Sequence, residues 1–110
     1  MPRGFYPGDL EEEVREHFAY LSSGMTPAQV KDLLATGKVT IPLGGPITIP
    51  GNHKPSRAEI VFIVRALWRL RGDEVGYIFN IGKTRTWELI KEGREKLQLL
   101  MTGIEEAEDA

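Results

Sequence analysis

The sequence contains no cysteine and only two histidines among its 110 residues. The absence of cysteine excludes disulfide bonds, thiolate metal ligands and cysteine nucleophiles together. Neither His17 nor His53 has a second ligand at metal-binding spacing, so we expect no metal site and no cofactor. No Ser/His/Asp arrangement and no cleft-like pair of carboxylates marks an active site. The sequence therefore predicts a protein that is not an enzyme.

The sequence also lacks an apolar run of membrane-spanning length, roughly 18 residues or more, so no membrane partner is expected. Its first residues, MPRGFYPGDLEEE, contain no apolar signal region and become acidic, which favours a cytoplasmic location. Apolar residues make up 41% of the chain and charged residues 27%. This balance allows a packed globular core of modest size.

The net charge of −2 conceals an uneven distribution of charged residues. Residues 53–96 contain ten lysines and arginines against six acidic residues, whereas the rest of the chain has four basic and ten acidic residues. A basic segment between acidic flanks is typical of a small protein with one face that binds a polyanion. Ordinary solvated helix surfaces give the same pattern, so charge alone does not decide between them.

The first part of the chain, residues 1–52, predicts two short helices and then a change of structure. A helix is expected over residues 9–22 and another over residues 26–37, because each begins with a capping box and has apolar residues at helical spacing. The short link between them favours a helical hairpin. This part of the chain is a candidate for self-association or for binding a partner.

The segment KVTIPLGGPITIPG follows these helices and has a different composition. It contains two Thr-Ile-Pro repeats around Gly44-Gly45, and paired glycines between β-branched runs are typical of a hairpin turn. However, Pro42, Pro46 and Pro50 have no amide hydrogen to donate to a neighbouring strand. The segment is therefore expected to form either a short β-hairpin at an edge or an extended arm.

Residues 53–103 predict three further helices. The first, over residues 56–72, opens with a capping box, is rich in apolar residues and is expected to be the most buried helix of the chain. A short helix is expected from Asp73 and a long one after Gly82. The remaining residues, 104–110, are acidic with little to bury, and we expect them to form a disordered tail.

The letters Gly82, Lys83 and Thr84 match the end of a phosphate-binding loop, which requires G-x-x-x-x-G-K-[ST] between a strand and a helix. Counting back from Gly82, the position of the first glycine is occupied by Tyr77. The preceding segment also has helical periodicity. A nucleotide-binding loop is therefore excluded by both spacing and context.

The same segment meets the requirements of two helices joined by a tight turn. Val75 and Phe79 are one helical turn apart, with the small residue Gly76 beside them. Asn80 tolerates the positive φ that such a turn requires. The inner face is then continued by Ile81, Thr86, Leu89 and Ile90.

The stretch DEVGYIFNIGKTRTWELIKEG resembles the helix-turn-helix of bacterial and phage DNA-binding proteins, of the excisionase-like or sigma-region-4-like type. Those families have alanine in place of Gly76, glycine in place of Asn80, Ser/Thr in place of Gly82 and valine in place of Thr86. The resemblance implies a helix-turn-helix domain. Together with the helical hairpin and the β-hairpin or arm expected from the preceding residues, it predicts a mainly α fold: a helix-turn-helix domain with an N-terminal helical hairpin and a short β-hairpin or extended arm.

The resemblance also implies that the second helix of the motif is a recognition helix in the major groove of double-stranded DNA. Arg85 and Arg94 are expected to hold phosphates, whereas Trp87 would contact DNA or else pack in the core or in a dimer interface. The complete set of implied DNA-binding residues is Lys83, Thr84, Arg85, Trp87, Glu88, Lys91 and Arg94.

We therefore expect a sequence-specific duplex-DNA-binding protein, a transcriptional regulator of bacterial or phage type that acts as a homodimer. The leucine-rich stretch over residues 96–101 is a further candidate for self-association. One alternative is a phage DNA-packaging or recombination accessory protein. Another is a protein-binding module, for example for RNA polymerase, in which the acidic helices make the contact and the helix-turn-helix is degenerate.

Overall fold

The computed structural model describes the backbone of residues 7–39 and 54–109 and the side chains of residues 10–39 and 54–99. This part of the chain is helical and contains no strand, which confirms the mainly α class. The expected β-hairpin or arm covers residues 38–51, and all of it except residues 38 and 39 lies outside the described residues. The helices are α1 (Pro7–His17), α2 (Ala19–Ser22), α3 (Pro27–Ala35), α4 (Arg57–Trp68), α5 (Gly72–Phe79) and α6 (Lys83–Asp109).

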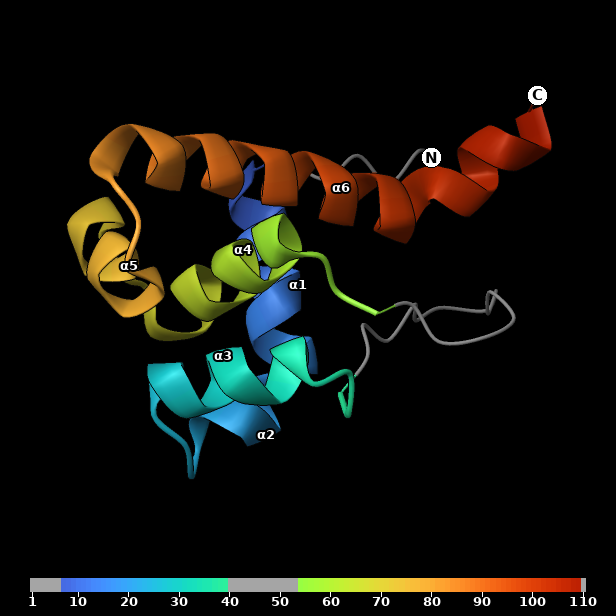
Figure 1. The fold of residues 1–110 in the computed structure, drawn as a ribbon. Helices are drawn as coiled ribbons and strands as arrows, with labels where there is room; N and C mark the ends of the chain where they lie inside the picture. Colours follow the sequence, from blue (N-terminus) through green and yellow to red (C-terminus); the bar gives the residue numbers. More distant parts are fainter. Residues whose placement is uncertain (1–6, 40–53, 110) are drawn as a thin grey trace.

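Helix α4 is the centre of the fold and contacts every other described helix. Helix α6 lies across one side of it, and α2 and α3 lie on the opposite side (Figure 1). Nearly the whole surface of α4 is apolar, which suits a helix enclosed on all sides. This confirms the expectation that α4 is the most buried helix. Its buried residues are Ala58, Glu59, Ile60, Val61, Phe62, Ile63, Val64, Ala66 and Leu67.

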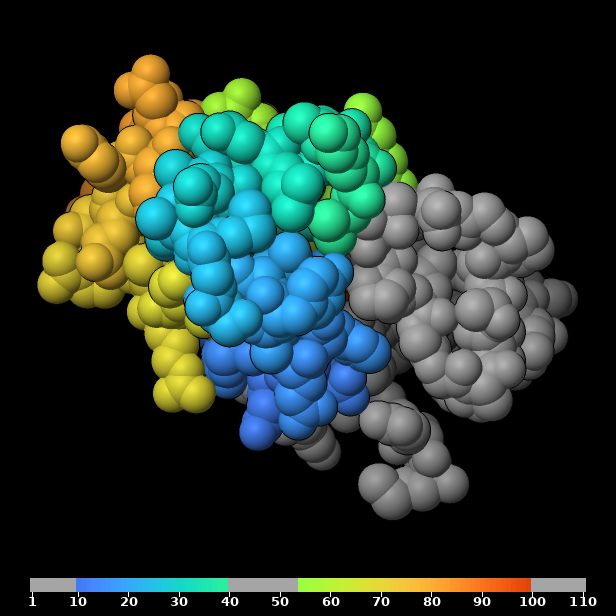
Figure 2. All heavy atoms as spheres, turned by 90° about the horizontal axis from the view of Figure 1, so that it is seen from below, coloured from blue at the N-terminus to red at the C-terminus, as the bar shows by residue number. Residues whose placement is uncertain are grey.

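The N-terminal helices complete the core around α4. Seen from below, α1, α2 and α3 cover the face that lies opposite α6, with α5 at the edge (Figure 2). Both α1 and α3 pack on α4. The segments 7–39 and 54–99 therefore share one hydrophobic core, and the expected boundary at residue 52 does not divide two cores. The N-terminal residues in this core are Leu10, Val14, Phe18, Leu21, Val30 and Leu34.

Two predicted capping boxes are present and determine where α3 and α4 begin. The Gln29 amide donates to Thr26 Oγ1 at 3.2 Å, and the Thr26 amide donates to Gln29 Oε1 at 2.9 Å. Ser56 and Glu59 exchange the equivalent bonds at 3.4 Å and 2.8 Å. Each box satisfies amides at a helix start that have no partner within the helix.

The first predicted helix ends at Ser22 as expected but differs from its prediction at its start and at one internal residue. It begins at Pro7, so Asp9 lies inside its first turn and is not the residue that caps it. It is also interrupted at Phe18, whose φ of −108° and ψ of 15° depart from helical values. Phe18 is fully buried, and its amide still donates to Val14 O at 3.0 Å. The chain therefore bends at a core residue before α2 begins at Ala19.

The predicted boundary between α4 and α5 is wrong. Helix α4 ends at Trp68, because Arg69 adopts the left-handed conformation with φ of 52° and ψ of 46°. Gly72, which was expected to end α4, is instead the first residue of α5, so the expected start at Asp73 lies inside that helix. Gly72 is buried, and its lack of a side chain makes room for Trp87.

Helix α6 is longer than the sequence predicts. It continues to Asp109 and so includes most of the residues that were expected to form a disordered tail, 104–110. Glutamate and alanine have high helix propensity. The acidic composition therefore allows the helix to continue although it offers little apolar surface to bury.

Candidate nucleic-acid interface

A left-handed residue turns the chain between α5 and α6. Asn80 has φ of 54° and ψ of 52°, a conformation that asparagine tolerates better than most residues. The amide of the next residue, Ile81, donates to Gly76 O at 3.0 Å and closes the end of α5. The expected left-handed conformation of Asn80 is confirmed, and α6 begins directly after Gly82.

Gly76 lies where the start of α6 passes α5. A Cβ at this position would be 3.0 Å from Ile81 O and 3.0 Å from Thr86 Oγ1. Thr86 is fully buried, and its hydroxyl donates to Gly82 O at 2.7 Å. The Thr86 amide donates to the same carbonyl at 2.9 Å, which gives Gly82 the role of N-cap. The absence of a side chain at Gly76 thus leaves room for the Thr86 hydroxyl at this contact.

Two cations from other helices hold the C-terminal end of α5. Lys31 Nζ donates to Ile78 O at 3.1 Å, and Arg57 Nη2 donates to Phe79 O at 3.4 Å. The Lys31 ammonium also lies 5.6 Å from the centroid of the Phe79 ring. Carbonyls at a helix C-terminus attract positive charge, so both contacts support the turn. Neither contact is predictable from local sequence patterns, because Lys31 and Ile78, for example, are 47 positions apart.

The beginning of α6 presents one face to solvent and buries the other. Leu89 and Ile90 are each 2% exposed, and with Thr86 they form the inner face, as predicted. The opposite face contains most of the candidate DNA-binding residues. Those that are exposed are Lys83, Thr84, Arg85, Trp87, Glu88 and Lys91.

Cations on one flank of α6 are paired with acids of the same helix. Arg85 Nη1 lies 3.4 Å from Glu88 Oε1, and Lys96 Nζ lies 3.1 Å from Glu92 Oε2. These exposed pairs contribute at most about 1 kcal/mol each to stability. An anion that binds Arg85 or Lys96 more tightly can therefore displace the carboxylate of Glu88 or Glu92 at little energetic cost.

Trp87 lies on the other flank of α6 and packs against the start of α5. A Cβ on Gly72 would be 2.6 Å from Cζ2 of the indole. The Arg65 guanidinium lies 5.7 Å from the centroid of the indole, at cation–π distance. Even so, 46% of Trp87 is exposed. The residue therefore packs within its own chain and still offers a surface to a partner.

A hollow of about 610 Å³ lies between α5 and α6 beside Trp87. Two exposed aromatic residues, Tyr77 and Trp87, line it together with the cations Arg71 and Lys83. Arg71 is paired with Asp73 at 3.3 Å. The hollow thus combines aromatic and positively charged groups next to the exposed face of α6.

Arg94 is separated from the other candidate residues. Its Nη2 lies 3.5 Å from Glu11 Oε1, and its guanidinium lies 5.8 Å from the centroid of the Phe62 ring. The side chain is held between α6, α1 and α4 and is 33% exposed. The structure therefore brings Lys83, Thr84, Arg85, Trp87, Glu88 and Lys91 together on the exposed part of α6 and places Arg94 in an ion-pair network.

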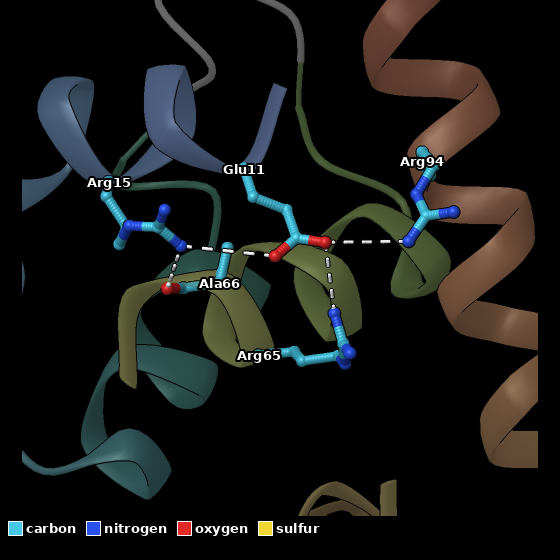
Figure 3. A network of polar contacts seen from close by, with 5 residues as sticks. All are labelled: Glu11, Arg15, Arg65, Ala66 and Arg94. Carbon is cyan, nitrogen blue, oxygen red and sulfur yellow. Dashed lines mark hydrogen bonds and ion pairs between the residues drawn. The ribbon is translucent and has the colours of Figure 1, made fainter. Parts of the chain in front are cut away.

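The ion-pair network around Arg94 was not predicted from the sequence. Glu11 lies among three arginines that come from three helices: Arg15, Arg65 and Arg94 (Figure 3). We call these four residues the arginine cluster. Glu11 and Arg94 are 83 positions apart, so no local sequence pattern predicts their contact.

Other kinds of site find no support among the described residues. There, no group of three or more histidines, aspartates or glutamates is arranged to hold a metal ion. No helix in the same part of the chain has the length and apolar character to cross a membrane.

Comparison of the chain with protein-family models, curated proteins and solved structures finds no match. The resemblance to helix-turn-helix proteins therefore rests on the residues of this chain alone.

Proposed function

We propose that this protein binds double-stranded DNA sequence-specifically, as a transcriptional regulator of bacterial or phage type, by placing the start of α6 in the major groove. The observation that carries the proposal is the turn between α5 and α6. Asn80 turns the chain, Gly76 allows the close approach of Thr86, and one face of the first turns of α6 is exposed.

The dimensions and chemistry of α6 suit this role. A helix with its side chains is about 10–12 Å across, and the major groove is about 12 Å wide. Lys83 and Thr84 are in the first turn of the helix, where residues of a recognition helix reach base edges. Lys83 suits the acceptors of guanine, and Glu88 suits the amino group of cytosine.

Arg85 and the start of the helix suit the phosphate backbone. The first amides of a helix have no partner within it and attract anions. Arg85 is exposed and, within the described part of the chain, is paired with the exposed Glu88, so a phosphate can compete for its guanidinium. These contacts would position α6 without reading sequence.

One such unit makes few base contacts, so we propose that the protein acts as a homodimer. Helix-turn-helix dimers bind two half-sites about one turn of DNA apart. Two units together would supply the affinity that specific binding requires. Leu99, on the C-terminal half of α6, is 55% exposed and is a candidate for the dimer contact.

A protein-binding module is the second candidate, and the hollow beside Trp87 favours it. Tyr77 is 88% exposed and Trp87 is 46% exposed. Aromatic residues are enriched in protein interfaces relative to other surfaces. A protein contact at this hollow would bury aromatic surface and would depend weakly on salt, whereas DNA binding would weaken steeply as salt rises.

The test is selection of bound sequences from random duplex DNA by the wild type and by a Lys83→Ala/Arg85→Ala variant. Both residues are exposed, so the variant should fold with stability within about 0.5 kcal/mol of the wild type per site. We expect the wild type to enrich a defined motif and the variant to lose it. Enrichment of the same non-specific pool by both proteins would contradict the proposal.

A further inference from the structure

The arginine cluster has more positive than negative charge. Glu11 Oε1 accepts from Arg65 Nη1 at 3.3 Å and from Arg94 Nη2 at 3.5 Å. Arg15 Nη1 lies 4.0 Å from Glu11 Oε2 and donates to Ala66 O at 3.4 Å (Figure 3). One carboxylate thus faces three guanidiniums, which leaves the cluster with two positive charges in excess.

The hydrogen-bonding capacity of these arginines is also not fully used. A guanidinium has five N–H donors, whereas a carboxylate has about four acceptor sites. The Nε atoms of Arg65 and Arg94 are buried and have no hydrogen-bond partner among the residues that the structure describes. The side chains of Arg15 and Arg65 are 25% and 21% exposed, so solvent still reaches them.

A hollow of about 300 Å³ opens beside the cluster. It is lined by Glu11, Arg15, Arg65, Arg69 and Leu70. Arg69, at the left-handed end of α4, is exposed and adds a further guanidinium to this hollow. The hollow therefore presents three arginines and a single carboxylate to whatever enters it.

The hollow is linked to Trp87 of α6 through Arg65. Arg65 connects the two, because it lines the hollow and its guanidinium lies 5.7 Å from the indole centroid. A helix about 10–12 Å across nearly fills a groove about 12 Å wide. Each flank of α6 would therefore lie close to a sugar-phosphate backbone. On the opposite flank, Arg85 and Lys96 are each paired with an acid of α6, so excess charge gathers on the Trp87 flank.

We propose that Arg15, Arg65 and Arg69 hold a phosphate group of the DNA backbone near Trp87, and that Glu11 occupies the guanidiniums of Arg15 and Arg65 until the phosphate displaces it. The inference rests on the proposed function. Arginine suits this role because its planar fork binds two phosphate oxygens at once. A phosphate would also supply acceptors that the single carboxylate lacks.

The test compares DNA affinity over a range of salt concentrations for the wild type, Arg15→Gln/Arg69→Gln and a matched Lys38→Gln/Lys54→Gln control. The control removes two charges at exposed positions outside the cluster. For the loss of one phosphate contact, the slope of log K against log salt falls by about 0.9. We expect that change, with about tenfold weaker binding, in the cluster variant but not in the control.

Two further variants separate phosphate binding from a structural role. Arg69→Gln alone changes an exposed residue and should weaken binding without unfolding the protein. Glu11→Gln removes the competing carboxylate and should tighten DNA binding severalfold, although it loses ion pairs within the fold. If Glu11→Gln loses stability and leaves DNA affinity unchanged, the cluster is structural and the inference is wrong.

The outcomes separate this inference from the proposed function. If the wild type binds DNA through Lys83 and Arg85 but the cluster variant behaves like the Lys38/Lys54 control, only the inference fails. If the wild type does not bind DNA, both fail. A titration with inorganic phosphate, followed by the NMR signals of arginine Nε–H groups, identifies the remaining case. If inorganic phosphate binds saturably but the cluster substitutions leave DNA affinity unchanged, the hollow is a site for a free anion. That result would overturn the assignment to DNA.

Discussion

The indole of Trp87 occupies the space that a side chain at position 72 would need. A Cβ on Gly72 would lie 2.6 Å from Cζ2 and 2.8 Å from Cε2 of Trp87. This contact connects the first residue of α5 to the exposed part of α6. Trp87 is therefore oriented by its own chain, with the Arg65 guanidinium near its ring and nearly half of its surface exposed.

Gly72→Ala should displace the indole and destabilise the protein. The added methyl group cannot be accommodated at this distance unless Trp87 or α5 moves, and such overpacking costs about 1–3 kcal/mol. Urea denaturation would measure the loss, and the indole N–H resonance of Trp87 would report the displacement. Gly24→Ala is the matched control, because a Cβ there meets nothing within 4 Å. Equal stability of the two variants would show that the contact is not tight.

Gly93→Ala should be more harmful. Helix α6 crosses α4 at Gly93, where a Cβ would overlap the carbonyl oxygen of Ala58 and lie 2.9 Å from Cβ of Phe62. Backbone cannot rotate away as a side chain can, so the helices would have to separate. We expect a loss of about 3 kcal/mol in the free energy of unfolding, despite a gain of about 1 kcal/mol in helix propensity. Unfolding by urea, followed by circular dichroism, checks this, and a variant as stable as the wild type would contradict the close crossing.

Gly76→Ala should be less harmful than the substitutions at Gly72 and Gly93. Its Cβ would lie 3.0 Å from Ile81 O and from Thr86 Oγ1, a tight contact in which the threonine side chain can shift. The gain in helix propensity, about 1 kcal/mol, acts in the opposite direction. We therefore expect a change of at most about 1 kcal/mol in the free energy of unfolding. A loss as large as that of Gly93→Ala would show that the turn cannot adjust.

Local signals in the sequence predicted much of this fold. The capping boxes at Thr26 and Ser56 and the turn at Asn80 depend on residues a few positions apart, so the sequence shows them directly. The structural role of a glycine is harder to predict, because a glycine can end a helix or can leave room for a neighbouring side chain. Gly72 was expected to end α4, but the left-handed Arg69 does so, and Gly72 instead makes room for Trp87.

Contacts between distant residues explain what the sequence did not predict about the candidate site. The exposed residues of α6 follow from helical periodicity once the inner face is known. The same periodicity predicts that Arg94 is exposed as well. Its side chain is instead paired with Glu11, which belongs to the first helix. The contact of Lys31 with Ile78 is similar. Such pairs depend on how helices pack, which a single sequence does not display.

Lys31→Met should weaken the support of α5. The variant keeps the apolar stem near Phe79 and removes the ammonium that donates to Ile78 O at 3.1 Å. We expect a loss of about 1 kcal/mol in the free energy of unfolding. DNA affinity should fall as well, because the turn that positions α6 becomes less well held. Lys38→Met is the control at an exposed lysine, and an equal effect of both variants would contradict a specific role for Lys31.

Substitutions of Asn80 test whether the left-handed turn is what positions α6. Its φ of 54° and ψ of 52° are readily adopted by glycine, tolerated by asparagine, and strained by about 1–2 kcal/mol for most other residues with a Cβ. Asn80→Gly should therefore leave stability and DNA affinity close to wild type. Asn80→Val, with a β-branched side chain in the same conformation, should lose about 2 kcal/mol or more. It should also weaken DNA binding under conditions where the protein is still folded.

The Asn80 pair is decided by measuring unfolding and DNA binding on the same samples. Asparagine is exposed at this position, so burial contributes little to the difference between the two variants. If Asn80→Val loses stability but binds DNA as the wild type does, the turn is needed for folding and not for placing α6 in the groove. If Asn80→Gly is as damaging as Asn80→Val, then the asparagine side chain itself, and not the backbone conformation, is what the turn requires.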